Sequence, residues 1–400
     1  MKILFVAHSF RRGGAEKCLF QLVERAQVQG IDCRVAGPAD GPYLEDYRGI
    51  GVKIKIIRSG SLFRNRNNLG LWRNAGNLLA STSQIISYIR QFRPDLIFTS
   101  TSSVLSGAVA AKIAGVPHVW HIHENFEMVR YLYFIPVDVL RPVYAMLSKK
   151  IIFVSNPAMQ SFYPGGHPKA EVIHNGVDQG LFGAGLPEQR EPAPIRKILF
   201  LGALEHRKGA DLLLNAFSRV KAEFPSAEIH LYGDGKPAYI DYLKKLVPSQ
   251  IKESVGFEGY CRDIPGALLN HDLVVVPSRA ESFSLVTVEA MLAGLPVIAT
   301  VCGGPEELIR NGISGRLIAP GDADLLAKAI MDLMRDPAGA FALGREARKT
   351  ALREFDLNRQ LGLILDAIDK TAGAGDRSVK PGRINEEGRH CGARPPFDRA

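Results

Sequence analysis

The chain has 400 residues, of which 46% are hydrophobic and 23% charged, and it carries a formal net charge of +9. This composition is typical of a soluble globular protein and excludes the disordered and fibrous classes for most of the chain. A chain of this length exceeds one ordinary core, so we expect two domains of roughly 150–200 residues each.

The cysteines and the N-terminal residues indicate the compartment. The five cysteines are scattered and lack metal-ligand spacing, which indicates reduced thiols in a reducing compartment. The apolar run Ile3-Leu-Phe-Val-Ala7 is too short for a secretion signal, and the uncharged stretch 96–111 is too polar to span a bilayer. We therefore expect a cytoplasmic protein, with peripheral attachment to the inner face of the cell membrane as a further expectation.

The positive charge favours acidic partners, which are nucleic acid, anionic lipid or phosphorylated metabolites. The sequence shows no zinc finger and no aromatic-basic RNA-binding signature, so we expect no nucleic-acid partner. Diphosphate substrates or an anionic membrane surface remain, beside the alternative of an ordinary basic, solvated surface.

The first half of the chain alternates strand-like and helix-like patterns. The apolar run 2–7 precedes a glycine turn and a helical pattern, as in a buried parallel strand followed by its crossover helix. Strand-like runs recur at 33–36, 53–57, 95–99, 118–121, 151–154 and 172–174. This alternation predicts an N-terminal Rossmann-like α/β domain over residues 1–185.

A second series follows a break at 186–196, which is rich in proline and charge and which we interpret as the interdomain linker. Strand-like runs then recur at 197–202, 228–232, 273–277, 296–299 and 315–318, and they predict a C-terminal Rossmann-like domain over 197–371. Residues 372–400 are rich in Gly, Arg and Pro, so we predict a disordered tail there.

The strongest motif is Glu281-Ser-Phe-Ser-Leu-Val-Thr-Val-Glu289, which follows a buried strand and enters a helix predicted over 286–293. Its carboxylates are eight positions apart, so they do not form an i,i+4 pair on one helical face. The N–H groups of Phe283, Ser284 and Leu285 would form a helix N-terminus suited to a diphosphate. The alternative is that Glu281 caps the helix and Glu289 lies on a solvated face.

This motif, which continues from Glu289 as Glu-Ala-Met-Leu-Ala-Gly-Leu-Pro-Val-Ile, resembles the signature of retaining family 4-type glycosyltransferases (glycosyl transferases group 1) of the GT-B fold. The resemblance implies two Rossmann-like domains that face each other across a cleft. It also implies that Glu281 contacts the sugar of a nucleotide-diphosphate donor and that Glu289 contacts the ribose hydroxyls. Ionised carboxylates suit vicinal diols because they only accept hydrogen bonds. Ser282, Phe283, Ser284 and Leu285 would complete the donor loop.

A second motif, Gly202-Ala-Leu-Glu-His-Arg-Lys-Gly209, follows the first strand of the second half. Arg207 and Lys208 are fixed cations that would neutralise the leaving diphosphate, unless they are only a turn of exposed charges. The pair Asp322-Ala-Asp324 is better explained as a helix N-cap than as a metal site, so we expect no metal and no cofactor. Relatives often have Gly-Arg where this chain has Gly202-Ala, a departure that makes Arg207 the substitute cation.

Two further motifs lie in the first half. Gly13 and Gly14, in Arg-Arg-Gly-Gly-Ala-Glu, let the backbone approach a phosphate at a helix start, and the family resemblance places them with Glu16 at the interdomain cleft. The segment Trp-His-Ile-His-Glu-Asn ends a predicted strand, and its two histidines lack an identifiable third metal ligand. By resemblance, His123 lines the acceptor side of the cleft; the alternative is a structural histidine.

Weaker matches occur in the same order as in the family, over roughly residues 1–370. Gly233 and Tyr260 resemble residues of the base-side loops of the family's donor site, and Gly303 and Gly304 are expected to permit close packing beside the cleft. The segments 155–156 and 172–178 resemble those that close the first domain.

The resemblance implies a retaining glycosyltransferase that moves a sugar from a UDP- or GDP-sugar to a glycan or lipid-linked acceptor, in cell-surface polysaccharide or lipopolysaccharide synthesis. The alternatives are a nucleotide-sugar epimerase and a non-catalytic nucleotide-sugar-binding protein. The segment 58–73 interleaves arginines with apolar residues, and 129–150 is aromatic-rich and ends in Ser-Lys-Lys. Both are candidates for contact with an anionic membrane, unless they are ordinary cleft walls and core.

Overall fold

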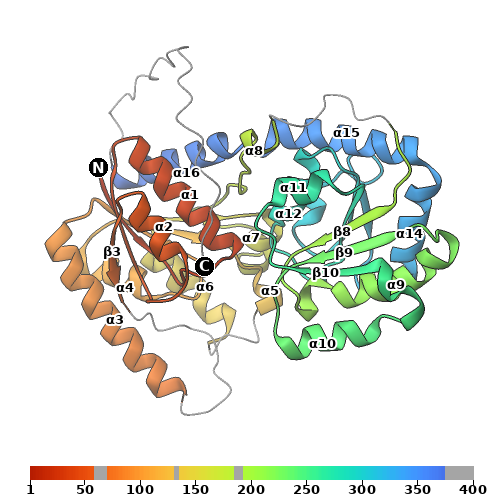
Figure 1. The fold of residues 1–400 in the computed structure, drawn as a ribbon. Helices are drawn as coiled ribbons and strands as arrows, with labels where there is room; N and C mark the ends of the chain where they lie inside the picture. Colours follow the sequence, from red (N-terminus) through yellow and green to blue (C-terminus); the bar gives the residue numbers. More distant parts are fainter. Residues whose placement is uncertain (58–69, 130–134, 184–191, 374–400) are drawn as a thin grey trace.

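The computed structural model describes residues 1–57, 70–129, 135–183 and 192–373 and contains two α/β domains (Figure 1). Each domain has one parallel sheet with helices on both faces. The fold class expected from the alternating patterns is confirmed.

The first domain contains a seven-stranded sheet in the order β3-β2-β1-β4-β5-β6-β7. Its strands are β1 Lys2–Val6, β2 Asp32–Gly37, β3 Lys53–Ile56, β4 Leu96–Ser100, β5 His118–Ile122, β6 Lys150–Phe153 and β7 Ala170–Val172. Its helices are α1 Gly14–Val28, α2 Tyr43–Gly49, α3 Gly70–Phe92, α4 Ser106–Ala114, α5 Phe126–Val129, α6 Val137–Leu147 and α7 Asn156–Phe162. Helix α1 packs on one face of the sheet, and α3 and α4 pack on the other.

The second domain contains a six-stranded sheet in the order β10-β9-β8-β11-β12-β13. Its strands are β8 Lys197–Leu201, β9 Glu228–Tyr232, β10 Val255–Gly259, β11 Leu273–Val276, β12 Val297–Thr300 and β13 Arg316–Ile318. Its helical elements are η2 His206–Lys208, α9 Ala210–Glu223, α10 Pro237–Leu246, η3 Ser249–Ser254, α11 Ile264–Leu269, α12 Leu285–Leu292, α13 Pro305–Leu308, α14 Ala323–Arg335 and α15 Pro337–Glu354. A short helix, α8 Gly180–Gly183, lies on the connection between the domains.

The strand orders position the motifs. In the first sheet the order reverses between β1 and β4, and in the second it reverses between β8 and β11. Ligands of doubly wound sheets bind at such reversal points, beyond the carboxyl ends of the strands. The loops after β1, β8 and β11 carry the Gly13-Gly14, Arg207-Lys208 and Glu281 motifs, so the topology brings three of the sequence motifs to the binding edges of the sheets.

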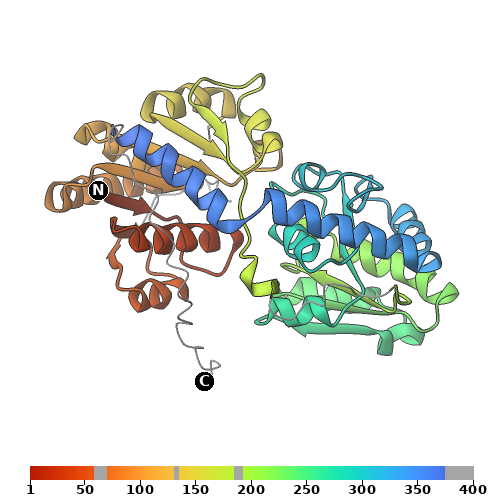
Figure 2. The same ribbon diagram turned by 90° about the horizontal axis from the view of Figure 1, so that it is seen from above.

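The last helix corrects the expected extent of the second domain. Helix α16, Leu357–Ala372, follows α15 directly but packs on the first domain, as Figure 2 shows. Its apolar residues recur at the spacing of one helical face and enter the core formed by β1, β4 and α1. They are Leu361, Ile364, Leu365 and Ile368. The boundary at 371 is therefore wrong for this helix, because an amphipathic pattern does not state which of two cores it covers.

Three further expectations from the sequence concern strand β10, the linker and tail, and membrane-spanning segments. Strand β10 was not expected from the sequence, because its Val-Gly-Phe-Glu-Gly run lacks a continuous apolar stretch. Most of the expected linker at 186–196 and of the tail at 372–400 lies outside the described residues. No helix among the described residues combines the length and the apolarity that crossing a membrane requires.

Candidate functional site

The loop after β11 holds Glu281 in a buried, positively charged environment. Its side chain is 7% exposed. The carboxylate Oε1 accepts hydrogen bonds from Lys208 Nζ at 2.5 Å and Ser278 Oγ at 3.0 Å, and Arg207 Nη1 lies 3.7 Å from Oε2. Burial alone would raise the pKa of Glu281, but the charges of Lys208 and Arg207 bring it below its ordinary value. Glu281 is therefore an ionised acceptor, and its side chain does not cap the helix.

Helix α12 begins immediately after this loop. Ser284 adopts a left-handed conformation at φ 80° as the residue before the helix, and its Oγ lies 2.8 Å from Thr287 Oγ1. Within the described residues, no hydrogen bond occupies the N–H groups of Phe283, Ser284 or Leu285. These donors are available to an anion, as the sequence predicts. The Phe283 side chain itself is buried in the core, so only its backbone can serve the site.

The turn after β8 lies beside this loop. Arg207 and Lys208 belong to the 3-10 helix η2, and Arg207 is the more exposed of the two. The N–H of Gly233 donates to Gly259 O at 2.7 Å, which joins the ends of β9 and β10. A Cβ on Gly233, whose φ is 152°, would lie 1.8 Å from Gly202 O. Gly202 and Gly233 thus permit two loops to touch at the rim of the site.

Sequence reasoning missed Arg279, which lies in the same loop. Its Nη1 and Nη2 donate to the Asp211 carboxylate at 2.8 and 2.7 Å, and Nη1 also donates to His206 O at 2.7 Å. The N–H of Arg279 donates to Arg207 O at 2.7 Å. Arg279 therefore fastens the Arg207-Lys208 turn to the Glu281 loop and to helix α9. Its position two residues before Glu281 could have indicated a role in this loop. Its partner Asp211 could not be predicted, because it lies 68 positions away in the sequence.

The glycine motif of the first domain opens helix α1. Glu16 accepts an ion-pair contact from His8 Nε2 at 3.2 Å. Burial lowers the pKa of His8, but Glu16 and other carboxylates raise it to a net value above the ordinary one. A Cβ on Gly14 would lie 3.4 Å from Leu285 Cδ1, so the N-terminus of α1 lies against that of α12. Gly13 and Gly14 are therefore placed at the meeting of the two domains.

His123 directly follows β5 and lies beside the buried His121. Its ring is 4.2 Å from the ring of His121, and in the described part of the chain its Nε2 has no hydrogen-bond partner. Burial and the neighbouring His121 hold the pKa of His123 well below its ordinary value, so the ring is neutral. Glu124 accepts hydrogen bonds from the N–H groups of Ser102 and His123, at 3.0 and 3.2 Å. Glu124 therefore supports the local backbone.

Backbone and side-chain groups of the first domain contact the donor loop and helix α12 directly. Ser282 Oγ accepts from Asn125 N–H at 3.0 Å, and Ser282 O accepts from Ser155 Oγ at 2.5 Å. Lys17 Nζ lies 2.8 Å from Glu289 Oε1. Ser282 is thus an interdomain contact, a position that the sequence did not predict. Glu289 has a 4% exposed side chain, so its interpretation as part of a solvated face is wrong.

Tyr260, expected on the base side, is 52% exposed after β10. Its place relative to Glu281 and Glu289 stays a prediction. Asp322 accepts from the N–H groups of Asp324 and Leu325, both at 2.9 Å, which confirms its prediction as an N-cap. Over the described ranges, no group of three or more His, Cys, Asp or Glu side chains is arranged to hold a metal ion.

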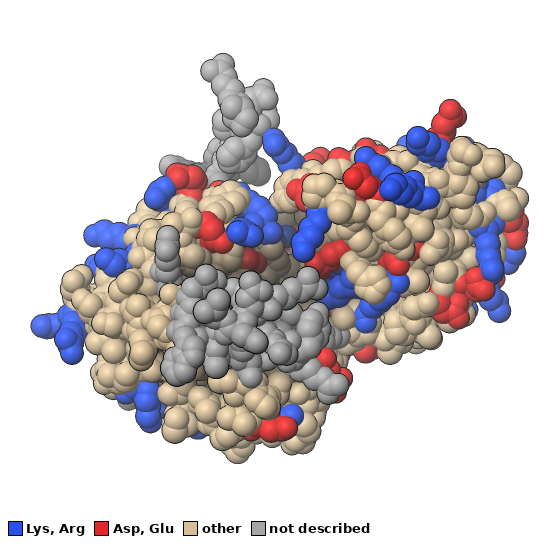
Figure 3. All heavy atoms as spheres, turned by 90° about the horizontal axis from the view of Figure 1, so that it is seen from below, with Lys and Arg blue, Asp and Glu red and all other residues tan. Residues whose placement is uncertain are grey.

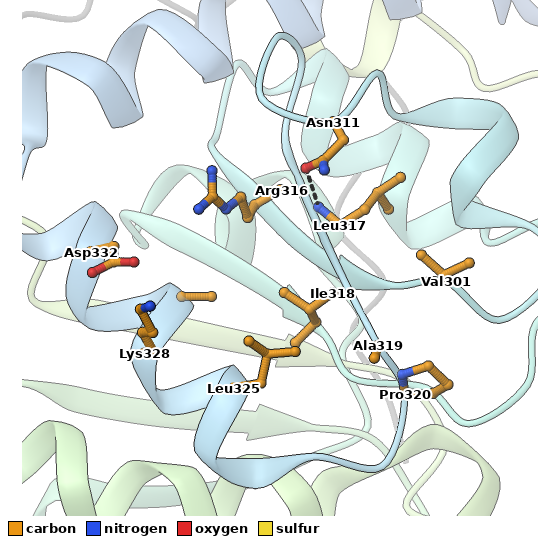
Figure 4. A pocket seen from close by; sticks show the side chains of 11 residues that line it. Val301, Asn311, Arg316, Leu317, Ile318, Ala319, Pro320, Leu325, Lys328 and Asp332 are labelled. Atoms are coloured by element: carbon orange, nitrogen blue, oxygen red, sulfur yellow. Dashed lines mark hydrogen bonds between the residues drawn. The ribbon is translucent and has the colours of Figure 1, made fainter.

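Two surface features lie apart from this site. A hollow of about 710 Å³ lies between β13 and α14 (Figure 4), and its lining contains none of the predicted site residues. On the face drawn in Figure 3, basic and acidic side chains are interspersed over both domains. Residues 58–69 of the arginine-rich segment 58–73 lie outside the described residues, as do residues 130–134 of the segment 129–150.

Known proteins resemble the chain over both domains. A model of Glycosyltransferase Family 4 matches residues 12–180, and a model of Glycosyl transferases group 1 matches residues 195–336. The glycogen synthase of Mycobacterium tuberculosis is 30% identical over 283 residues, which cover 67% of this chain and 66%, just under two thirds, of the relative. The phosphatidyl-myo-inositol mannosyltransferase of Mycolicibacterium smegmatis is 26% identical over 385 residues, which cover 94% of this chain and 95% of the relative.

A solved structure agrees with these relatives. Anabaena Alr3699/HepE in complex with UDP superimposes with a TM-score of 0.77 and 26% identity, covering 92% of this chain and 100% of that one. The two parallel sheets, the motif loops at their carboxyl ends and the matched family models are mutually consistent. The chain belongs to the group 1, family 4 glycosyltransferases and has the GT-B fold.

Proposed function

We propose that the protein transfers a sugar, with retention of anomeric configuration, from a nucleotide-diphosphate sugar to a glycan or lipid-linked acceptor. The observation that carries this proposal is the buried Glu281 carboxylate, which Lys208 and Arg207 contact beside the open N-terminus of α12. An ionised acceptor suits sugar hydroxyls, and cations next to free N–H groups suit a diphosphate. The Anabaena relative was solved with UDP and with UDP-glucose, which supports a UDP-sugar as the first donor to test.

The proposed reaction uses charges fixed by the protein. As the bond from the anomeric carbon to the diphosphate breaks, Lys208, Arg207 and the N–H groups at Phe283–Leu285 stabilise the departing anion. We assign no carboxylate as a nucleophile, so the scheme contains no covalent sugar–enzyme intermediate. Instead, the acceptor hydroxyl attacks the anomeric carbon from the face that the diphosphate leaves, and it gives its proton to the departing phosphate. In this scheme Glu289 holds the ribose hydroxyls, His123 lines the acceptor side, and the closed cleft excludes water. Neither metal nor cofactor takes part.

The acceptor and the location are part of the same proposal. A relative named as a phosphatidyl-myo-inositol mannosyltransferase supports a lipid-linked acceptor, as in synthesis of cell-surface polysaccharide or lipopolysaccharide. Helix α6 exposes Val139 and Met146, at 53% and 60%, which supports contact of this helix with the inner face of the cell membrane. Co-sedimentation with anionic vesicles at low salt tests this contact, and absence of binding contradicts it.

A transfer assay tests the proposed reaction. UDP- and GDP-sugars are incubated with glycan and lipid-linked acceptors, with and without EDTA, and the anomeric configuration of the product is determined by NMR. We expect transfer with retention that EDTA does not reduce. Conversion of the donor sugar without an acceptor would favour an epimerase, and donor binding without transfer to any acceptor would favour a non-catalytic binding protein.

A further inference from the structure

An ion pair joins the two domains across the cleft. Lys17 lies in the first turn of α1, and its Nζ is 2.8 Å from Oε1 of Glu289, which lies 272 positions later on α12. The Glu289 side chain is 4% exposed, whereas that of Lys17 is 31% exposed. A buried carboxylate that lacks a charge partner is strongly destabilising. Lys17 is the cation that the described part of the chain supplies to Glu289.

Neighbouring cations are engaged elsewhere. Arg11 and Arg12 pair with Asp40 and Asp46 inside the first domain. Arg207 and Lys208 contact Glu281 inside the second domain. Among the lysine and arginine ion pairs found in the described ranges, the pair of Lys17 with Glu289 is the one that crosses the cleft.

The ammonium is held in its charged form at this position. Burial lowers the pKa of Lys17, but the charge and the hydrogen bond of Glu289 raise it to a net value above the ordinary one. The N-terminal turns of α1 and α12 are in contact here, since a Cβ on Gly14 would lie 3.4 Å from Leu285. Lys17 thus places a positive charge where both helices present their N-termini.

We propose that Lys17 is a positioning residue for the donor, which orients Glu289 and offsets its charge when the nucleotide diphosphate binds. The inference rests on the proposed function, in which Glu289 holds the ribose and Glu281 the sugar. The diphosphate that joins these two groups then lies between the carboxylates. Lys208 and Arg207 offset the charge of Glu281, and Lys17 offsets that of Glu289.

Lys17 also couples donor binding to domain closure. It belongs to the acceptor-side domain, whereas Glu289, Lys208 and Arg207 belong to the donor-side domain. The charge that favours the diphosphate is therefore complete only when the domains are together. Closure of the cleft is the only movement that this coupling requires.

Isothermal titration calorimetry with UDP and GDP tests the inference. The proteins are wild type, Lys17→Met, Lys17→Arg, Glu289→Gln and the double variant Lys17→Met/Glu289→Gln. Lys112→Met is the matched control, because Lys112 is an exposed lysine on α4 of the same domain and its loss changes the net charge equally. We expect Lys17→Met to weaken binding of the nucleotide that wild type binds by about tenfold or more, as for loss of a buried charge partner. Lys17→Arg and Lys112→Met should retain most of the affinity.

The double variant separates a role through Glu289 from a general effect. If Lys17 acts by offsetting Glu289, Lys17→Met should weaken binding much less in the Glu289→Gln background than in wild type. In the transfer assay, Lys17→Met should raise the donor KM by a similar factor, with a smaller change in kcat. Uridine or guanosine keep the ribose that Glu289 holds but lack the diphosphate, so Lys17→Met should weaken their binding less than it weakens that of UDP or GDP.

Each outcome decides the question. Wild-type affinity and KM in Lys17→Met, or equal losses in both backgrounds, overturn the inference. Absence of UDP and GDP binding to wild type overturns the proposed donor site itself, which distinguishes the two failures. Far-UV circular dichroism monitors folding, and Lys17→Gln replaces Lys17→Met if the latter is unfolded.

Discussion

Lys208 forms an ion pair with the buried Glu281, and the pair joins the loops that follow two neighbouring strands, β8 and β11. Lys208 Nζ lies 2.5 Å from Glu281 Oε1, and Ser278 holds the same oxygen from within the loop. The cation that we assign to the leaving diphosphate is therefore prepositioned before any donor binds. Preorganised charges of this kind need no rearrangement during the reaction.

Replacing Lys208 should mainly lower turnover. We expect Lys208→Ala to reduce kcat by about 10²–10³, as for loss of one preorganised donor that stabilises developing charge. Steady-state transfer assays measure the effect, with Lys245→Ala on helix α10 as the control for loss of an exposed lysine in the same domain. Near-full turnover in Lys208→Ala would contradict the assignment.

Breaking the Arg279–Asp211 pair should loosen the Arg207-Lys208 turn. The pair has two hydrogen bonds and side chains that are 24% and 9% exposed. We expect Arg279→Met to lower the free energy of unfolding by about 2–3 kcal/mol, because Asp211 loses its charged partner. Urea denaturation measures this change.

A double-mutant cycle with Asp211→Asn checks that the two residues act together. The loss in Arg279→Met/Asp211→Asn should be smaller than the sum of the two single losses. Additive losses would show that Arg279 stabilises the fold through other contacts. The kcat of Arg279→Met should also fall, because His206 O loses the Nη1 donor that helps to hold the Arg207-Lys208 turn.

Gly233 should tolerate no side chain. A Cβ there would lie 1.8 Å from Gly202 O, and its φ of 152° disfavours other residues. We expect Gly233→Ala to cost about 3 kcal/mol or more of the free energy of unfolding, since backbone strain and the overlap combine. Gly259→Ala is the matched control: its φ is also positive, at 72°, but nothing lies within 4 Å of the added Cβ.

The control should lose only about 1–2 kcal/mol, the cost of a left-handed conformation for alanine. Urea denaturation of both variants measures the difference. Equal losses would contradict the close approach of the two loops at Gly202 and Gly233.

His118 should make the protein less stable in acid. Burial lowers the pKa of His118 to about 3, and its ring nitrogens contact Thr99 Oγ1 and Ser148 Oγ, both at 2.9 Å. An ordinary histidine pKa is about 6.5, so the unfolded chain binds a proton first as the pH falls. Between about pH 6.5 and 3 the contribution of His118 to stability is therefore lost progressively.

The pH dependence of unfolding measures this effect. The free energy of unfolding of His118→Gln should fall less steeply than that of wild type over the same range. Parallel curves for the two proteins would show that His118 titrates alike in the folded and unfolded states.

Short-range patterns in the sequence predicted most of the strands and helices, and they predicted the Glu281 motif and the Arg207-Lys208 turn of the site. Strand-like runs predicted every strand of the described residues except β10, and continuous apolar ones such as 2–7 are expected where a parallel strand is buried on both faces. The capping role of Asp322 and the open helix start at Ser284 also follow from residues within a few positions of each other. Glu281 and the Arg207-Lys208 turn were predicted because each motif directly follows an apolar strand.

Only the tertiary structure shows which residues far apart in the sequence contact one another. The pairs of Lys17 with Glu289 and of Arg279 with Asp211 join positions 272 and 68 apart, and no local pattern specifies them. The packing of α16 on the first domain is of the same kind, because an apolar helical face fits either core equally well. The physical reason is the distance along the sequence over which each effect acts. Helix propensity, capping and periodicity depend on residues a few positions apart, whereas a buried charge is paired with a distant residue only when the chain has folded.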